Sequence, residues 1–369
     1  MLETLWNIPD LWERLSAERR TILLYGMGNG ADKILRVCAE KNIPVAGVFA
    51  SDGFVRGQSF RGMPVRRWAD MKAMYGAENT VVLMAFASSR PEVLENVARI
   101  ASETTLLAPD VPVFGKGLFD RAFAVAHRAE LLAVRELLSD GESRRIFDLV
   151  LRYKLSGEIS CLLEAVSAPK EVLQNVLRPE RIKTAADLGA YTGDTVRSLA
   201  AVAPNLETVY AMEPDARNFR KLSDYAEAES RFRVLPVCAA AWNAKTELTF
   251  DAGGNRNSSA IANRSAVLSG RPARARTVRA LPLDRAVGNG RIDFIKYDVE
   301  GSEREAIEGS RNVILRDCPT LLVSLYHRTE DLFALPLFLR REFPFYRRFF
   351  LRRAAGVPAW DLNLYVRED

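Results

Sequence analysis

Short apolar runs alternate with amphipathic segments along the first third of the chain. The runs have the β-branched character of strands, and the segments carry apolar positions at helical spacing. Strands are predicted at residues 21–25, 45–49 and 80–86, and helices at residues 31–41 and 91–101. Such alternation with short loops is typical of β-α-β units around a parallel sheet. It predicts a Rossmann-like α/β domain over residues 1–119.

The pattern turns helical in the middle of the chain and then returns to α/β alternation. Residues 120–180 have apolar side chains at helical spacing and few β-branched runs, which indicates a helical connector. Beyond the connector, strands are predicted at residues 185–188, 208–212, 232–236, 246–250, 292–297, 321–325 and 361–366. These strands, with helices between them and a late hairpin, predict a second Rossmann-like α/β domain over residues 181–369.

Composition narrows the class of protein. Hydrophobic residues make up 48% of the sequence, which is enough to bury two cores. The net charge of +5 is mild and comes largely from one arginine-rich region, so no nucleic-acid partner is expected. Four scattered cysteines and only two histidines argue against a disulfide framework and a metal site. The acidic N-terminal residues and the lack of a long apolar run predict a cytoplasmic protein without a transmembrane segment, and leave a homo-oligomer open.

A glycine-containing turn follows the first strand of the second domain. It reads ADLGAYTGDT, and its candidate cofactor contacts are Asp187, Gly189, Tyr191, Gly193, Asp194 and Thr195. Glycine lets a ligand approach the backbone closely, and the helix that follows offers free N–H donors. Neither a phosphate-binding loop nor a complete Gly-x-Gly-x-x-Gly fingerprint is present, which disfavours phosphate binding.

A carboxylate follows the next strand, about twenty residues further on. Glu213 at this position is placed to accept hydrogen bonds from both hydroxyls of a ribose, and Asn218 follows on the next helix. Each motif alone also fits a plain turn or a solvated helix cap. Together, in this order and spacing, they favour an adenosyl cofactor.

Three further polar residues follow later strands. Asp298 and Glu300 come after the strand at residues 292–297, and His327 comes after the strand at residues 321–325. Since ligands of open α/β sheets lie beyond the carboxyl ends of the strands, these residues are expected at the mouth of the same crevice. The carboxylates could orient a sugar, take a proton or hold a divalent cation, and His327 could remove a hydroxyl proton. The alternative is that His327 caps its strand; His127, within a helical pattern, is interpreted as structural or exposed.

The stretch IDFIKYDVEGSEREAIEGSRNVI…CPTLLVSLYH resembles the hallmark of FkbM-type methyltransferases. The upstream segments DLGAYTGDT, YAMEPDARNFRKL and CAAAWNAKTELTF stand in the expected order, so the resemblance covers roughly residues 180–369. It implies a class I methyltransferase fold that uses S-adenosylmethionine and methylates hydroxyls of sugars or secondary metabolites. It also implies that Asp187, Gly189, Gly193 and Glu213 contact the cofactor, and that Asp298, Glu300 and His327 line the acceptor site.

Two segments of this domain have no settled role. The polar, glycine-containing stretch at residues 253–269 is long for a loop, and Asn257, Ser258 and Ser259 could contact the cofactor or the acceptor; a surface excursion is the alternative. Paired arginines alternate with phenylalanines over residues 338–353. They could contact an acidic glycan, a phosphate, a membrane surface or nucleic acid. We favour a helix and strand whose aromatic side packs inward while the arginines face water.

The first domain has a glycine-rich turn of its own. Gly26, Gly28 and Gly30 follow a strand and open a helix, and Asp52 ends the next strand. The context suits nucleotide binding, although the glycine spacing departs from the usual fingerprint. A scaffold or dimerisation role is the alternative.

The combined prediction is an S-adenosylmethionine-dependent O-methyltransferase of a saccharide or other hydroxylated small molecule, active in glycan modification. Two alternatives remain at this point. One is a nucleotide- or nucleotide-sugar-binding oxidoreductase or sugar-modifying enzyme that works through the N-terminal domain. The other is a non-catalytic binding protein that keeps both folds.

Overall fold

The computed structural model describes residues 5–115, 117–251, 260–261, 275–358 and 360–369. Its first domain is a six-stranded sheet of order β3-β4-β2-β1-β5-β6, parallel except for the β3–β4 pair. The strands are β1 (Thr21–Tyr25), β2 (Gly47–Phe49), β3 (Ser59–Phe60), β4 (Met63–Arg66), β5 (Thr80–Met84) and β6 (Thr105–Leu107). The central strands are buried on both sides because helices cover both faces. These helices are α2 (Leu11–Ser16), α3 (Asn29–Glu40), α4 (Trp68–Tyr75) and α5 (Pro91–Glu103).

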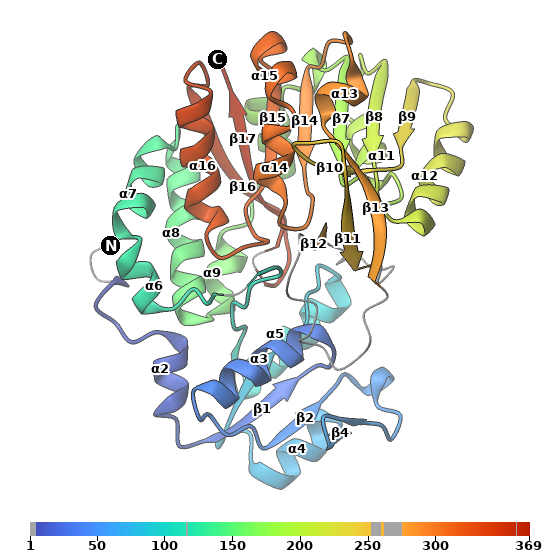
Figure 1. The fold of residues 1–369 in the computed structure, drawn as a ribbon. Coiled ribbons are helices and arrows are strands. Elements are labelled where there is room, and N and C mark those ends of the chain that lie inside the picture. The colour runs from blue at the N-terminus through green and yellow to red at the C-terminus, as the bar shows by residue number, and fades with distance from the viewer. Residues whose placement is uncertain (1–4, 116, 252–259, 262–274, 359) are drawn as a thin grey trace.

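A helical region joins the two domains (Figure 1). Its main helices are α6 (Arg121–Ala126), α7 (Arg128–Leu137), α8 (Gly141–Ser156) and α9 (Ile159–Glu164). Asp120 and Asp140 begin α6 and α8 by accepting hydrogen bonds from backbone N–H groups in the first turn. The buried face of α7 and α8 joins the core of the second domain.

The second domain is built on a seven-stranded sheet of order β16-β17-β15-β14-β7-β8-β9. The strands are β7 (Thr184–Leu188), β8 (Thr208–Met212), β9 (Arg233–Val237), β14 (Phe294–Tyr297), β15 (Thr320–Ser324), β16 (Arg348–Arg353) and β17 (Leu362–Arg367). All pairs are parallel except those made by β17. The sheet is accompanied by α11 (Asp194–Ala200), α12 (Ala216–Ala228), α13 (Leu283–Val287), α14 (Glu303–Glu308), α15 (Arg311–Asp317) and α16 (Asp331–Glu342). The predicted fold class, two α/β domains with helices between them, is confirmed.

One strand lies in a different sheet from the predicted one. The segment predicted at residues 246–250 is β11 (Thr246–Asp251), which pairs with β13 (Ala275–Leu281) and β12 (Ala260–Ile261) in a separate four-stranded sheet completed by β10 (Ala240–Ala241). In β11, Leu248 is buried while its neighbours Glu247 and Thr249 are exposed. A strand with only one buried face does not suit the interior of a sheet covered on both sides.

The arginine-rich C-terminal region packs only partly as predicted. Phe343 and Phe349 are buried and Arg348 is exposed, as expected, but Arg352 and Arg353 are buried. They face the helical connector rather than water, so the prediction was wrong for these two residues.

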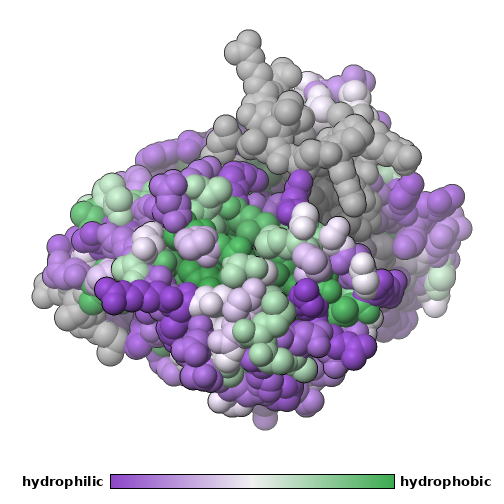
Figure 2. Space-filling view, turned by 90° about the horizontal axis from the view of Figure 1, so that it is seen from below, coloured by the Kyte–Doolittle hydropathy of each residue, from purple (hydrophilic) through white to green (hydrophobic). Residues whose placement is uncertain are grey.

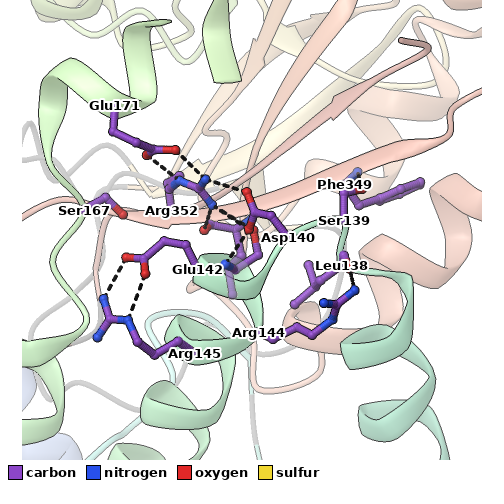
Figure 3. A network of polar contacts seen from close by, with 12 residues as sticks. Leu138, Ser139, Asp140, Glu142, Arg144, Arg145, Ser167, Glu171, Phe349 and Arg352 are labelled. Carbon is purple, nitrogen blue, oxygen red and sulfur yellow. Dashed lines mark hydrogen bonds and ion pairs between the residues drawn. The ribbon is translucent and has the colours of Figure 1, made fainter. Parts of the chain in front are cut away.

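Arg352 clamps the connector to strand β16 (Figure 3). Its guanidinium donates to the carboxylates of Asp140 (2.7 Å) and Glu171 (2.7 and 2.8 Å) and to the Ser143 hydroxyl (2.8 Å). Burial lowers the pKa of Arg352, but hydrogen bonds to the two carboxylates outweigh it and raise that pKa above its ordinary value. The arginine therefore stays charged.

The molecular surface on the side of the N-terminal domain carries both hydrophobic and hydrophilic residues. Figure 2 shows hydrophobic residues gathered toward the middle of this face and hydrophilic residues around them. No described helix is long and apolar enough to cross a membrane.

Candidate active site

A cavity of about 410 Å³ lies where several strands of the second sheet end. That volume falls in the range of small-molecule sites. Of the predicted site residues, Gly189, Tyr191, Asp194, Thr195, Glu213, Asn218, Asp298 and Glu300 line it. Asp187, Gly193 and His327 do not. The structure thus gathers both predicted motif groups around one cavity, with three of their members behind its wall.

Gly189 is required by the close approach of two strand ends. Its φ is +92°, and a Cβ atom built there would lie 2.0 Å from the backbone oxygen of Asp298. Gly193, at φ +83°, lies against the Tyr225 ring, which a Cβ would approach to 2.7 Å. Both glycines therefore serve the geometry of the turn, and only Gly189 also borders the cavity.

Glu213 is a buried carboxylate whose orientation is fixed by the backbone. Its two oxygens accept hydrogen bonds from the N–H groups of Tyr191 (2.9 Å) and Asp215 (2.8 Å). Burial raises the pKa of Glu213 to about 7, although these hydrogen bonds oppose the rise. The next carboxylate, Asp215, accepts from the N–H of Asn218 (3.1 Å) and so begins helix α12.

Lys296 lies between the carboxylates of Asp187 and Asp298. The sequence analysis did not identify this residue. Its Nζ lies 3.4 Å from an Asp187 oxygen and 3.1 Å from an Asp298 oxygen. Burial lowers the pKa of Lys296, but the two carboxylates outweigh it and raise that pKa, so the ammonium persists. Asp187, 5% exposed, was expected to contact the cofactor; it does not line the cavity and accepts a hydrogen bond from the Lys296 ammonium, and its cofactor contact stays a prediction. A lysine within an otherwise apolar buried strand was the available signal.

Asp298 is held as a carboxylate by several donors. Besides Lys296, it accepts hydrogen bonds from the hydroxyls of Tyr326 (2.9 Å) and Ser324 (3.1 Å). Burial by itself would raise the pKa of Asp298, but the charges of Lys296 and His327 hold that pKa well below its usual range. A carboxylate so stabilised is a weak base.

His327 is fully buried, and Glu303 is the residue that holds it. The ring N–H at Nδ1 donates to the Glu303 carboxylate (2.8 Å), and Nε2 lies 3.5 Å from Asp298 and 3.7 Å from Glu300. Burial lowers the pKa of His327, but Glu303, Glu300 and Asp298 outweigh it and raise that pKa to about 10. A histidine that is protonated at neutral pH has no lone pair to offer, and the role of His327 as a base stays a prediction.

Glu300 borders the cavity between these charged groups. Its backbone has a φ of +54°, an unusual conformation for a residue other than glycine. Its side chain is 22% exposed, and burial raises its pKa to about 7 against the opposing charge of His327. Strained backbone of this kind is often retained at functional sites.

Further lining residues, which the sequence analysis did not identify, come from the C-terminal hairpin of β16 and β17 and from the segment that follows β6. They are Val113, Trp360, Asp361, Asn363 and Tyr365, together with Tyr326 after β15. The rings of Tyr326 and Trp360 are nearly parallel at 25°, with centroids 6.4 Å apart. No local motif marks these residues, because the fold brings them together from distant segments.

Packing explains two of the three glycines in the N-terminal turn. A Cβ at Gly26 would lie 2.5 Å from the Phe86 ring, and one at Gly30 would lie 2.4 Å from the backbone oxygen of Ala85. Neither Gly28 nor Asp52, which begins a short exposed turn, borders the cavity. The predicted nucleotide site therefore stays a prediction.

The remaining candidates lie elsewhere. Asn257, Ser258 and Ser259 are outside the described residues. His127 is half-buried and stacks on Phe333, with centroids 4.7 Å apart. Within the described ranges no group of histidine, cysteine, aspartate or glutamate side chains is arranged to hold a metal ion.

Comparison with known families identifies the second domain. Residues 187–356 match the family model described as the methyltransferase FkbM domain. This part of the chain is an FkbM methyltransferase domain. The match includes the turn after β7, Glu213, the segment from Asp298 to Glu303, and His327. No curated protein matches the chain.

Solved structures extend the likeness beyond the FkbM domain. A crystal structure of methyltransferase FkbM from Methylobacillus flagellatus KT is 20% identical, with a TM-score of 0.68, and the alignment covers 96% of this chain and 92% of that one. The N-terminal domain is therefore part of a fold shared with that protein. An rRNA methylase from Streptococcus thermophilus is 12% identical over 55% of this chain and 97% of its own, with a TM-score of 0.36. That value is too low to add to the assignment.

Proposed function

We propose that this chain is an S-adenosylmethionine-dependent O-methyltransferase that acts on a saccharide or another hydroxylated small molecule. One observation carries the proposal: a single cavity joins the turn after β7 and Glu213 to the carboxylates of Asp298 and Glu300. When bound, S-adenosylmethionine supplies an electrophilic methyl group on a sulfonium. The residues of the chain then need only to align and deprotonate the acceptor.

The cofactor half of the cavity has suitable donors and acceptors. Each oxygen of Glu213 accepts one backbone hydrogen bond, and a carboxylate has about four lone-pair sites, so both oxygens can also accept from ribose hydroxyls. Asp194 and Asn218 add polar groups to the same wall. An acidic wall also suits a positively charged sulfonium. These residues support S-adenosylmethionine as the methyl donor that the sequence predicts.

The acceptor half combines carboxylates, an amide and aromatic rings. Asp298, Glu300 and Asn363 can accept hydrogen bonds from hydroxyl groups, and Trp360 offers a flat apolar surface beside them. Sugar rings present hydroxyls at their edges and C–H groups on their faces, and this set of side chains matches both. The combination favours a saccharide over a purely apolar alcohol.

Glu300 is the group we assign to take the acceptor proton. Asp298 is stabilised as a carboxylate by Lys296 and two hydroxyls, and His327 is already protonated. Glu300 borders the cavity and has a pKa of about 7, close to the operating pH that an effective base requires. His327 acts through Glu300 and Asp298 and is thus a positioning residue.

Calorimetric titration with S-adenosylhomocysteine tests the cofactor site. We expect micromolar binding by the wild type and a loss of at least tenfold in Glu213→Ala. Glu207→Ala is the matched control, because Glu207 lies just before the opposite end of β8 and its side chain is 68% exposed. Absence of binding by a folded wild type would overturn the proposal.

An acceptor screen tests the reaction. Purified protein and methyl-labelled S-adenosylmethionine are incubated with glycosides, phenols, aliphatic alcohols and amines, and NMR locates the new methyl group. Transfer to a glycoside oxygen supports the proposal. Transfer only to nitrogen or only to phenols refutes the saccharide assignment but leaves the methyltransferase domain intact.

A further inference from the structure

The N-terminal domain contacts the acceptor half of the cavity through Lys33. This residue lies on helix α3, and its Nζ donates to the backbone oxygens of Pro112 (2.7 Å) and Val113 (2.6 Å). Val113 lines the cavity. The ammonium of Lys33 also interacts electrostatically with Glu300 in the second domain.

The methyltransferase domain also contacts the segment that contains Pro112 and Val113. The N–H of Phe114 donates to the backbone oxygen of His327 (2.8 Å). Its ring covers Gly301, where a Cβ would lie 2.8 Å away, and the Arg328 guanidinium stacks on it at 4.4 Å. Residues 112–114, of which Val113 lines the cavity, are therefore held by hydrogen bonds from Lys33 and to His327.

A second contact joins the N-terminal domain to the loop between β16 and β17. Ser88 follows strand β5 and forms an isolated antiparallel bridge with Val357, with N–H···O distances of 2.8 and 3.0 Å. Val357 lies in the loop between β16 and β17, which also carries the cavity-lining residues Trp360 and Asp361. The segment after β5 thus contacts the loop that carries Trp360 and Asp361, and the segment after β6 contributes Val113 to the same cavity.

We propose that the N-terminal domain is a functional part of the acceptor site, and that Lys33 is a positioning residue that holds the Val113 wall and presents a positive charge to Glu300. The inference rests on the proposed assignment of the cavity to methyl transfer. It gives the N-terminal domain a role that requires no ligand in its own glycine turn.

The charges around this pair determine the expected effect. Glu300 is influenced by the charges of His327, Asp298, Glu303 and Lys33, and Arg328 and Lys296 lie on the elements next to it. Lys33 itself is influenced by Arg36 and Glu300, and burial lowers its pKa to about 8. Removing the Lys33 charge should make Glu300 retain its proton to higher pH.

Carbon-13 NMR of a sample labelled at glutamate carboxyls measures this directly, with the Glu300 signal assigned from Glu300→Gln. We expect the Glu300 midpoint of about 7 to move upward in Lys33→Gln and Lys33→Met, and to return in Lys33→Arg. Lys41→Met, just after the C-terminal end of α3 and paired with Asp120, is the matched control and should leave the midpoint unchanged.

Hydrogen exchange separates the charge of Lys33 from its hydrogen bonds. Lys33→Met should speed exchange of the Phe114 amide about tenfold, whereas Lys33→Gln, which can still donate, should change it much less. An unchanged Glu300 midpoint in folded Lys33→Gln, or an equal shift in Lys41→Met, overturns the proposal. Titration of the wild type with S-adenosylhomocysteine is run in parallel: failure there refutes the proposed function, while the NMR result still decides whether Lys33 acts on Glu300.

Discussion

Replacement of Arg352 by methionine is expected to destabilise the protein by about 2–3 kcal/mol. The arginine side chain is 3% exposed and bonds the carboxylates of Asp140 and Glu171. Removing one member of a buried ionic network typically costs about 3–5 kcal/mol. Here the two carboxylates are 32% and 31% exposed, so water can partly solvate them once the arginine is gone. The lower figure follows from that partial solvation.

Urea denaturation followed by far-UV circular dichroism measures the change. With a slope of about 3 kcal/mol per molar urea, the midpoint should fall by roughly 0.7–1 M. Arg348→Met is the control because Arg348 begins the same strand and is exposed, and a surface change of this kind is worth about 0.5 kcal/mol or less. Equal midpoints for the two variants would refute the clamp.

A further variant distinguishes the loss of the attraction of Arg352 from the cost of leaving two carboxylates without their cationic partner. Adding Asp140→Asn and Glu171→Gln to Arg352→Met removes the two carboxylates that have lost their partner, and most of the lost stability should return.

The stability that Arg352 contributes should also depend on pH, in a direction that the pKa of Asp140 defines. Arg352 and Ser143 lower the pKa of Asp140 against the opposing effect of burial, so the contribution of the clamp is present above the ordinary value of about 4 and disappears as pH falls through the lower folded value. A difference between wild type and Arg352→Met that stayed constant into that acidic range would contradict this reasoning.

Three further outcomes follow from the site. Gly189→Ala should abolish S-adenosylhomocysteine binding or folding, because its Cβ would lie 2.0 Å from the Asp298 oxygen; a normal titration curve would disprove the close approach. The rate of methyl transfer should rise as pH increases through about 7, where Glu300 loses its proton, and Glu300→Gln should remove that rise and reduce the rate about 100-fold or more above this pH. His327, with its pKa raised from 6.5 to about 10, contributes stability below its unfolded value that is lost as pH rises toward 10. His327→Gln should flatten that part of the stability profile, as seen by urea denaturation at pH 6 and pH 9.5.

The elements that could be predicted from sequence are those with strong local patterns. The strand at residues 208–212 has the predicted bounds, and helix α5 begins at the predicted Pro91. Strand β14 begins two residues later than predicted: the N–H of Ile292 donates to the Asp317 side chain, and the Asp293 side chain accepts from the N–H of Thr184 at the start of β7. Strand β11 shows a clear alternation, but alternation does not specify which sheet a strand joins.

The site residues also divide into those that a local sequence pattern predicts and those that only the fold brings together. Residues of the turn after β7 are consecutive in sequence, so their arrangement around one backbone turn could be anticipated. Lys296 and Glu303 escaped notice because a single buried charge has meaning only when its partners are known, and those partners lie on other elements. Trp360 and Val113 reach the cavity from segments that have no motif at all.

Strand β17 carries a consequence for the synthesis of the protein. It lies between β15 and β16, so the methyltransferase sheet lacks an interior member until residues 362–367 have left the ribosome. The N-terminal sheet, by contrast, has all its described strands once residue 107 has emerged. The first domain can therefore form during translation, while the second keeps the edges of β15 and β16 unpaired until the last strand arrives. Those open edges define a period in which a nascent chain is most exposed to aggregation and most in need of a chaperone.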